Sequence, residues 1–174
     1  MNWRLAFLYA VRVKRKVRGK MTITVLLLLH GLGAVFLLGA VSHQAIGVWK
    51  TKPLPAGNFF QSLINVRGAS YTNAIVVLYI VVSIGGAIIY PAYVMDVKAS
   101  LNDARMLSAI GAFEIKEHFA IVGIAILPTY WYFWKRKAPS EELITRRLVT
   151  SFLAALVWWN FMIGHILNNI KGLI

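Results

Sequence analysis

The sequence contains no cysteine, few acidic residues and little charge of any kind. Because thiolate chemistry needs sulfur, the lack of cysteine excludes disulfide bonds, thiolate metal sites, iron–sulfur clusters and covalently attached c-type haem. Charged residues make up 14% of the 174 residues, compared with roughly 25% in an ordinary soluble domain. Hydrophobic residues make up 59%. This composition argues against a soluble globular protein and leaves histidine as the main candidate ligand for a cofactor.

Basic residues outnumber acidic ones by 19 to 6, which gives a formal net charge of +13 at pH 7. Several of them lie within the first 20 positions: Arg4, Arg12, Lys14, Arg15, Lys16, Arg18 and Lys20. They precede an apolar run that begins at Met21, where basic side chains meet anionic headgroups and hold a segment on the cytoplasmic side. The charge therefore predicts membrane lipid as a partner, and not nucleic acid. The apolar run is longer than the core of a signal peptide, so we expect it to be retained.

Four apolar segments are each long enough to cross a bilayer core of roughly 30 Å at about 1.5 Å per residue. They lie at about residues 21–43, 74–95, 107–134 and 148–168. Short polar stretches separate them. The sequence thus predicts an all-α fold, in which residues 1–174 form one membrane domain, a four-transmembrane-helix bundle in the inner (plasma) membrane of the cell.

The segments outside the spans carry their own predictions. Residues 2–19 mix apolar and basic side chains, which favours either a basic amphipathic helix lying in the interface or a frayed tail. Residues 58–66, after a proline-rich stretch, are expected to form a short interfacial helix. Ser140 can cap the last helix, which would then begin before its span. An even number of spans places both termini on one side, and the basic N-terminal flank indicates that this side is the cytoplasm.

All four histidines lie in or at the ends of the predicted spans: His30, His43, His118 and His165. Ionisable side chains inside a membrane are costly and indicate function. Neutral imidazole is an axial ligand of b-type haem, although a lone histidine also serves as an interhelical hydrogen-bonding group. Counted at about 1.5 Å per residue, His30, His118 and His165 share the inner half of the bundle, whereas His43 lies near the opposite face. We therefore expect one b-type haem, held by His118 and either His30 or His165, with His43 an interfacial residue or a quinone or proton contact.

The third span contains the densest polar sequence. Glu114 and His118 are one helical turn apart on the same face, so Glu114 is a candidate to accept a hydrogen bond from His118 and fix its ring. Glu114, Glu117 and His118 also match part of a di-metal carboxylate motif, which we disfavour because the other acidic residues lie in connections. Alternatively, this helix projects from the membrane, and Lys116 and Glu117 are simply solvated.

A short resemblance supports haem. Residues 29–34, Leu-His-Gly-Leu-Gly-Ala, followed by Leu-Gly-Ala at 38–40, are similar to the first helix of small membrane proteins of the copper-resistance D type and of the HemJ-type protoporphyrinogen oxidases. The likeness covers about 15 of the 174 residues. The HemJ-type resemblance implies haem ligation by His30. A copper role is disfavoured by the shortage of methionine and histidine on the outer face and by the lack of cysteine.

These observations predict a cytochrome b-like membrane subunit that passes electrons between a quinone and a partner subunit of a larger respiratory or photosynthetic complex. The haem would supply the chemistry, and the chain would place it and tune its potential. Two alternatives stay open. One is an accessory subunit of such a complex that binds no cofactor, and the other is a HemJ-like membrane oxidase acting on a hydrophobic substrate. The tyrosines that end the second span, Tyr90 and Tyr93, suit a headgroup boundary or a quinone site.

Overall fold

The computed structural model describes the backbone of residues 3–50, 68–136 and 142–171, and the side chains of residues 21–170 within those ranges. Its long helices are α1 (Trp3–Val48), α3 (Thr72–Tyr93), α5 (Leu107–Lys135) and α6 (Leu143–Lys171). The predicted all-helical fold is confirmed, and α6 begins before its predicted span, as expected. The interfacial helix expected at 58–66 and the cap expected at Ser140 lie outside the described residues.

Within the described residues, three segments are long and apolar enough to cross a membrane: Met21–Val48, Gly68–Asp103 and Leu143–Ile170. Each contains one of the predicted spans. The helix α5 matches the remaining predicted span and has 29 residues, but it carries Glu114, Lys116 and Glu117 and is not one of the three. A helix at 107–134 is therefore confirmed, and its passage through a membrane stays a prediction.

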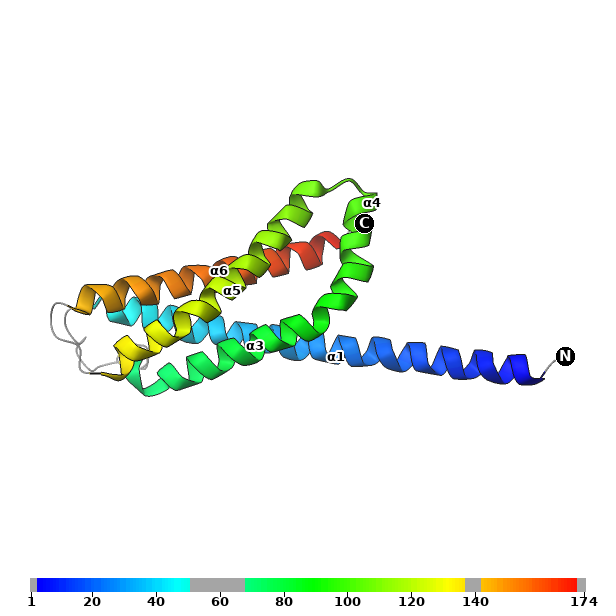
Figure 1. Ribbon diagram of the computed structural model, residues 1–174, viewed down its shortest axis with the longest axis horizontal. Coiled ribbons are helices and arrows are strands. Elements are labelled where there is room, and N and C mark those ends of the chain that lie inside the picture. Colours follow the sequence, from blue (N-terminus) through cyan, green and yellow to red (C-terminus); the bar gives the residue numbers. More distant parts are fainter. Residues whose placement is uncertain (1–2, 51–67, 137–141, 172–174) are drawn as a thin grey trace, which may run out of the picture.

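The helix α1 runs without a break through the basic N-terminal segment and the first apolar run, over 46 residues. The segment 2–19 is thus helical from Trp3 onward, but it continues the axis of the first span and forms no separate surface helix. The sequence gives a physical reason, since this stretch has no proline and its single interior glycine, Gly19, costs only about 1 kcal/mol. Figure 1 shows α1 extending as a straight rod well past the other helices.

The chain between α3 and α5 turns away from α1 (Figure 1). Pro91 lies near the end of α3 and is followed by a π-helical stretch, η2 (Val94–Lys98), and by the short helix α4 (Ala99–Asp103). Proline and π-helical turns are the usual causes of helix bends. Arg105 then adopts a left-handed conformation, with φ of 56°, while Met106 donates its backbone N–H to the carbonyl of Leu101 at 2.9 Å. These two features end α4 and reverse the chain into α5.

Two separate apolar clusters hold the bundle together. The larger cluster takes side chains from all four long helices: Leu37, Val41, Ile75, Tyr79, Leu127, Tyr130, Leu153, Ala154 and Val157. The smaller cluster takes them from η2, α4, α5 and α6: Leu101, Ala109 and Leu167, with Val97, Met106, Ile110, Phe113, Ile163 and Ile170 packed around them. The helix α1 contributes to the first cluster alone, and at the other end of the bundle it contacts α3 through His30. We call the half around Gln44 and Tyr130 the closed end, and the half around His30, Tyr93 and Lys116 the open end.

Candidate functional site at the open end

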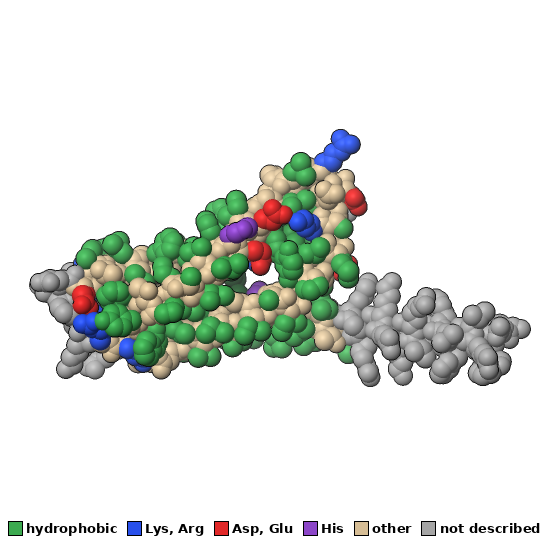
Figure 2. Space-filling model, in the orientation of Figure 1, with side chains coloured by type: hydrophobic (Ala, Val, Ile, Leu, Met, Phe, Trp, Pro, Cys, Tyr) green, Lys and Arg blue, Asp and Glu red, His purple; other side chains and the backbone are tan. Residues whose placement is uncertain are grey.

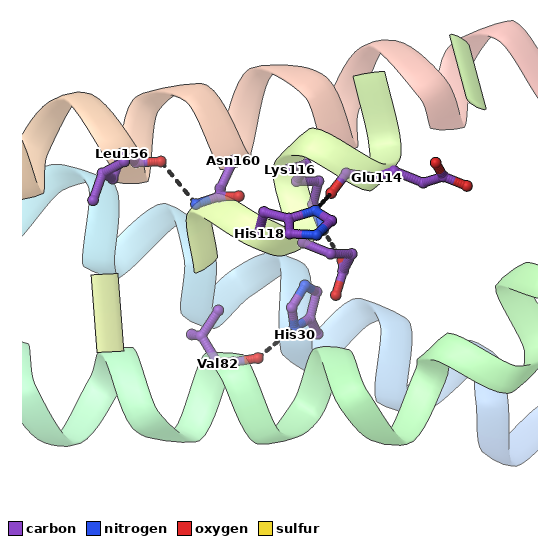
Figure 3. Close-up of polar contacts among 8 residues, drawn as sticks. His30, Val82, Glu114, Lys116, His118, Leu156 and Asn160 are labelled. Carbon is purple, nitrogen blue, oxygen red and sulfur yellow. Dashed lines mark hydrogen bonds and ion pairs between the residues drawn. The ribbon is translucent and has the colours of Figure 1, made fainter. Parts of the chain in front are cut away.

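His30 is fixed on α1 by a contact with α3. Its Nδ1 lies 3.0 Å from the backbone carbonyl oxygen of Val82 (Figure 3). A carbonyl oxygen only accepts, so Nδ1 donates, and Nε2 carries the lone pair of the neutral ring. Gly85 and Gly86 lie against the ring, where added Cβ atoms would come within 3.4 and 3.3 Å of it. The half-buried imidazole is therefore held against the backbone of α3.

Lys116 and Glu117 form an ion pair in the same part of the bundle. The Lys116 Nζ donates to Glu117 Oε1 at 2.8 Å, and the Lys116 side chain is only 18% exposed. Its stem packs on α6, since a Cβ at Gly164 would lie 3.6 Å from Lys116 Cε. Both charges are within electrostatic range of His30. The structure thus corrects the interpretation of Lys116 as a solvated residue, because this lysine lies between two helices.

His118 lies on the exposed surface of α5, and its Nδ1 is 2.7 Å from the backbone carbonyl oxygen of Glu114. We expected the Glu114 carboxylate to make this contact. It instead accepts a hydrogen bond from Lys98 Nζ of η2 at 2.9 Å, as an exposed salt bridge. A carbonyl four residues earlier in a helix is always within reach of a side chain on the next turn, and a nearby lysine is the stronger partner for a carboxylate. Glu114 therefore orients His118 through its backbone.

His165 is also exposed, on α6, where its ring lies parallel to that of Phe161 with 6.2 Å between centroids. Of the three histidines expected to share one depth, His30 is the one that is half-buried, while His118 and His165 face outward. The described part of the chain contains no group of three or more histidine, aspartate and glutamate side chains arranged to hold a metal ion. A haem iron needs only two axial ligands, so this finding bears on the di-metal interpretation more than on haem.

The closed end contains a buried polar network that sequence reasoning missed. Gln44 is 1% exposed, and its Nε2 donates to the carbonyl of Gly68 at 2.8 Å and to Thr72 Oγ1 at 3.1 Å. Its Oε1 accepts a hydrogen bond from the hydroxyl of Tyr130. Beside this network the Nδ1 of His43 is hydrogen-bonded to a neighbouring phenol, that of Tyr71. The predicted first span ended at residue 43, so Gln44 was assigned to the following connection, whereas α1 continues to Val48 and buries it.

Family models, curated proteins and solved structures were compared with the chain, and none of them matches. The open end is the candidate functional site. Its distinguishing features are two imidazoles whose Nδ1 atoms contact backbone carbonyl oxygens and the Lys116–Glu117 ion pair, of which Lys116 is the more buried member.

Proposed function

We propose that the chain is a membrane subunit that binds one b-type haem through His30 and His118 and passes electrons between a quinone and a partner subunit of a larger redox complex. The proposal rests on a feature that both imidazoles have. Each uses Nδ1 to bond a backbone carbonyl, Val82 at 3.0 Å and Glu114 at 2.7 Å. Such a bond fixes the ring and leaves Nε2 to bind a metal, as in most histidine ligands.

The choice of His30 over His165 as the second ligand rests on position. Figure 3 draws His30 and His118 in one part of the bundle, on α1 and α5. The His165 ring is stacked on Phe161 of its own helix instead. When bound, a b-type haem supplies one-electron transfer at a potential set by its ligands and its burial. The chain's own part is to hold both rings through carbonyl oxygens.

The exposure of His118 favours a role inside an assembly. Haem needs an apolar environment, and this chain alone does not cover the His118 ring. Large exposed apolar side chains continue around it on α5: Ile115, Ile121, Val122 and Ile124. Contiguous apolar surface of this kind marks contact with lipid or with another protein. A partner subunit seated there would complete the enclosure of the haem.

The test is a reduced-minus-oxidised absorption spectrum of the purified protein. We expect the α-band of a b-type haem, which is lost in His30→Ala and in His118→Ala. The controls are His43→Ala at the closed end and His165→Ala on α6, and both should keep most of the signal. Loss in His165→Ala with retention in His30→Ala would show that the ligand pair is wrong. Equal loss in His43→Ala and His118→Ala would defeat the single-haem proposal.

A second candidate function is an accessory subunit that binds no cofactor. It is favoured by the outward positions of His118 and His165. In that case the purified protein shows no haem band even after expression with added haem. The subunit would still co-purify with its complex, because its exposed apolar surface needs a partner or lipid.

We further propose that the chain crosses the plasma membrane with both termini in the cytoplasm. The basic residues before Met21 support a cytoplasmic N-terminus. The C-terminus lies on the same side when α5 crosses as a fourth span beside the three long apolar segments. Reporter domains fused after Lys50 and after Arg136 should then both lie outside the cell. A cytoplasmic reporter after Arg136, with an external one after Lys50, would show that α5 does not cross.

A further inference from the structure

Among the described residues, two buried polar atoms at the open end have no hydrogen-bond partner: the hydroxyl of Tyr93 on α3 and the Oδ1 of Asn160 on α6. Buried polar atoms are nearly always bonded, so each exception calls for a water, an ion or a ligand. The Asn160 amide nitrogen already donates to the carbonyl of Leu156 at 2.8 Å. The Asn160 oxygen is therefore an unused acceptor, and the Tyr93 hydroxyl is an unused donor.

Both atoms lie near the Lys116–Glu117 ion pair. Tyr93 stacks on Phe113, and Lys116 Nζ lies 4.8 Å from the centroid of the Phe113 ring. Asn160 lies one turn before Gly164, the position on α6 against which the Lys116 stem packs. Figure 3 shows the Asn160 side chain extending from α6 toward α5, where Lys116 is drawn. Polar groups of α3, α5 and α6 thus converge beside His30 of α1.

The surroundings of these groups are apolar and flat. The rings of Tyr93 and Phe113 stack with 3.6 Å between centroids and 11° between planes, and Tyr90 lies 6.1 Å from Phe113. About two turns earlier on α3, Gly85 and Gly86 present bare backbone next to His30. Figure 2 shows the surface hollowed between α3 and α5, with acidic and histidine side chains visible in the hollow. Apolar walls with a few convergent polar groups are typical of small-molecule sites.

The chemistry of the polar groups limits the classes of ligand that the open end could bind. No group of three metal-ligating side chains is present among the described residues, which disfavours a metal ion. A free anion is disfavoured because Glu117 already neutralises Lys116. The ligand that fits these groups is a flat apolar ring with oxygen atoms on its edge. In its oxidised form the oxygens accept hydrogen bonds from Tyr93 and Lys116, and in its reduced form the hydroxyls donate hydrogen bonds to Asn160 and Glu117.

We propose that the open end binds the ring of a quinone, in both its quinone and its quinol form, between Tyr93 of α3 and Asn160 of α6. The ring carbonyls accept hydrogen bonds from the Tyr93 hydroxyl and from Lys116 Nζ, and the quinol hydroxyls donate to Asn160 Oδ1. The apolar tail leaves through the hollow between α3 and α5. This site deepens the proposed function by placing the quinone, and it uses residues other than the two proposed haem ligands.

The test is a titration of the purified full-length chain in lipid nanodiscs with decylubiquinone, followed by quenching of tryptophan fluorescence. We expect saturable binding that is weakened about fivefold to tenfold in Tyr93→Phe and in Asn160→Leu, the effect of losing one hydrogen bond. Tyr93→Phe keeps the ring stack. Matched controls are Tyr132→Phe and Asn168→Leu, whose side chains are exposed on α5 and α6, and both should bind like the parent. Circular dichroism checks that every variant is folded.

Non-saturable partitioning, or equal affinity in the parent and in both Tyr93→Phe and Asn160→Leu, would overturn the quinone site and leave water as the occupant. Titration of His118→Ala separates this inference from the haem proposal. If that variant has no haem band but binds decylubiquinone normally, both stand. If the parent shows no haem band yet binds the quinone in an Asn160-dependent manner, the haem proposal fails and the quinone site stands.

Discussion

The Gln44 network of the closed end and the polar groups around Lys116 at the open end differ in how completely they are hydrogen-bonded. At the closed end, Gln44, Thr72 and Tyr130 are at most 1% exposed, and together they join α1, α3 and α5 through hydrogen bonds. At the open end, Lys116 is 18% and Glu117 is 39% exposed, while Tyr93 and Asn160 keep unused hydrogen-bonding atoms. A fully bonded network specifies one packing of the helices. Unused polar atoms, in contrast, retain the capacity to bind something else.

The path of the chain explains the difference. Near Gln44 all four long helices contribute to one apolar cluster, so polar side chains that enter it must find partners there. Beyond His30, the bend through Pro91 and η2 carries the chain away from α1 (Figure 1). The second cluster contains no residue of α1 among the described ones. The open end is consequently shared by fewer helices and has room for a ligand.

The largest expected effect is at Gln44, the centre of the closed end. Gln44→Leu leaves the buried hydroxyl of Tyr130 without its acceptor, and together with the other lost bonds it should cost about 2–5 kcal/mol of unfolding free energy. The double variant Gln44→Leu/Tyr130→Phe removes both partners and should recover much of that loss. Unfolding in detergent micelles, followed by circular dichroism, measures both. A double variant no more stable than Gln44→Leu would mean that the network does not hold the closed end.

Two glycines of α5 allow the packing at the two ends of the bundle to be compared within one helix. A Cβ at Gly123 would overlap the Tyr79 hydroxyl, which is buried and bonds the carbonyl of Ala120 at 3.2 Å, so Gly123→Ala should destabilise by about 1–3 kcal/mol. A Cβ at Gly111 meets nothing within 4 Å. Gly111→Ala should therefore stabilise, by up to about 1 kcal/mol of helix propensity. Unfolding in detergent micelles measures the stability of both variants. Similar changes in unfolding free energy for Gly123→Ala and Gly111→Ala would contradict the packing described at Tyr79.

The ion pair of the open end should contribute less. Lys116→Met leaves the Glu117 carboxylate without its cation, but Glu117 is partly exposed, so we expect a loss of only about 1 kcal/mol. The double variant Lys116→Met/Glu117→Leu should be as stable as the parent, because replacing both charges with apolar groups removes their desolvation cost. Thermal melts of the three proteins provide the comparison. A large loss in the double variant would show that the pair is a structural element like the Gln44 network.

The smallest effect is expected at Glu114. Its carboxylate makes an exposed salt bridge with Lys98, and exposed pairs contribute little. His118 is bonded to the Glu114 backbone, which Glu114→Gln leaves in place. Potentiometric titration of Glu114→Gln should therefore overlay that of the parent. A raised haem potential would instead show that the charge acts on the haem directly.

The sequence predicted the helices well because run length and apolar content are local properties. The pairing of Gln44 with Tyr130 joins positions 86 residues apart, and no local pattern contains it. Depth counting placed His30, His118 and His165 in the same half of the bundle, but depth does not say which way a side chain faces. The structure shows that His30 turns toward α3 while the other two turn outward. Likewise, the spacing of Glu114 and His118 correctly indicated that Glu114 contacts His118 from one turn away. The contact is made by the backbone carbonyl oxygen of Glu114, and not by the predicted carboxylate oxygen.

The length of α1 has a mechanical consequence. Forty-six residues at about 1.5 Å each make a rod of roughly 69 Å, more than twice the thickness of a bilayer core. One part of α1 packs against the bundle, and the N-terminal part, which carries the basic residues, extends beyond the other helices (Figure 1). The helix is continuous from Trp3 through His30 to Val48. A change in the tilt of its basic segment would therefore also change the position of the imidazole.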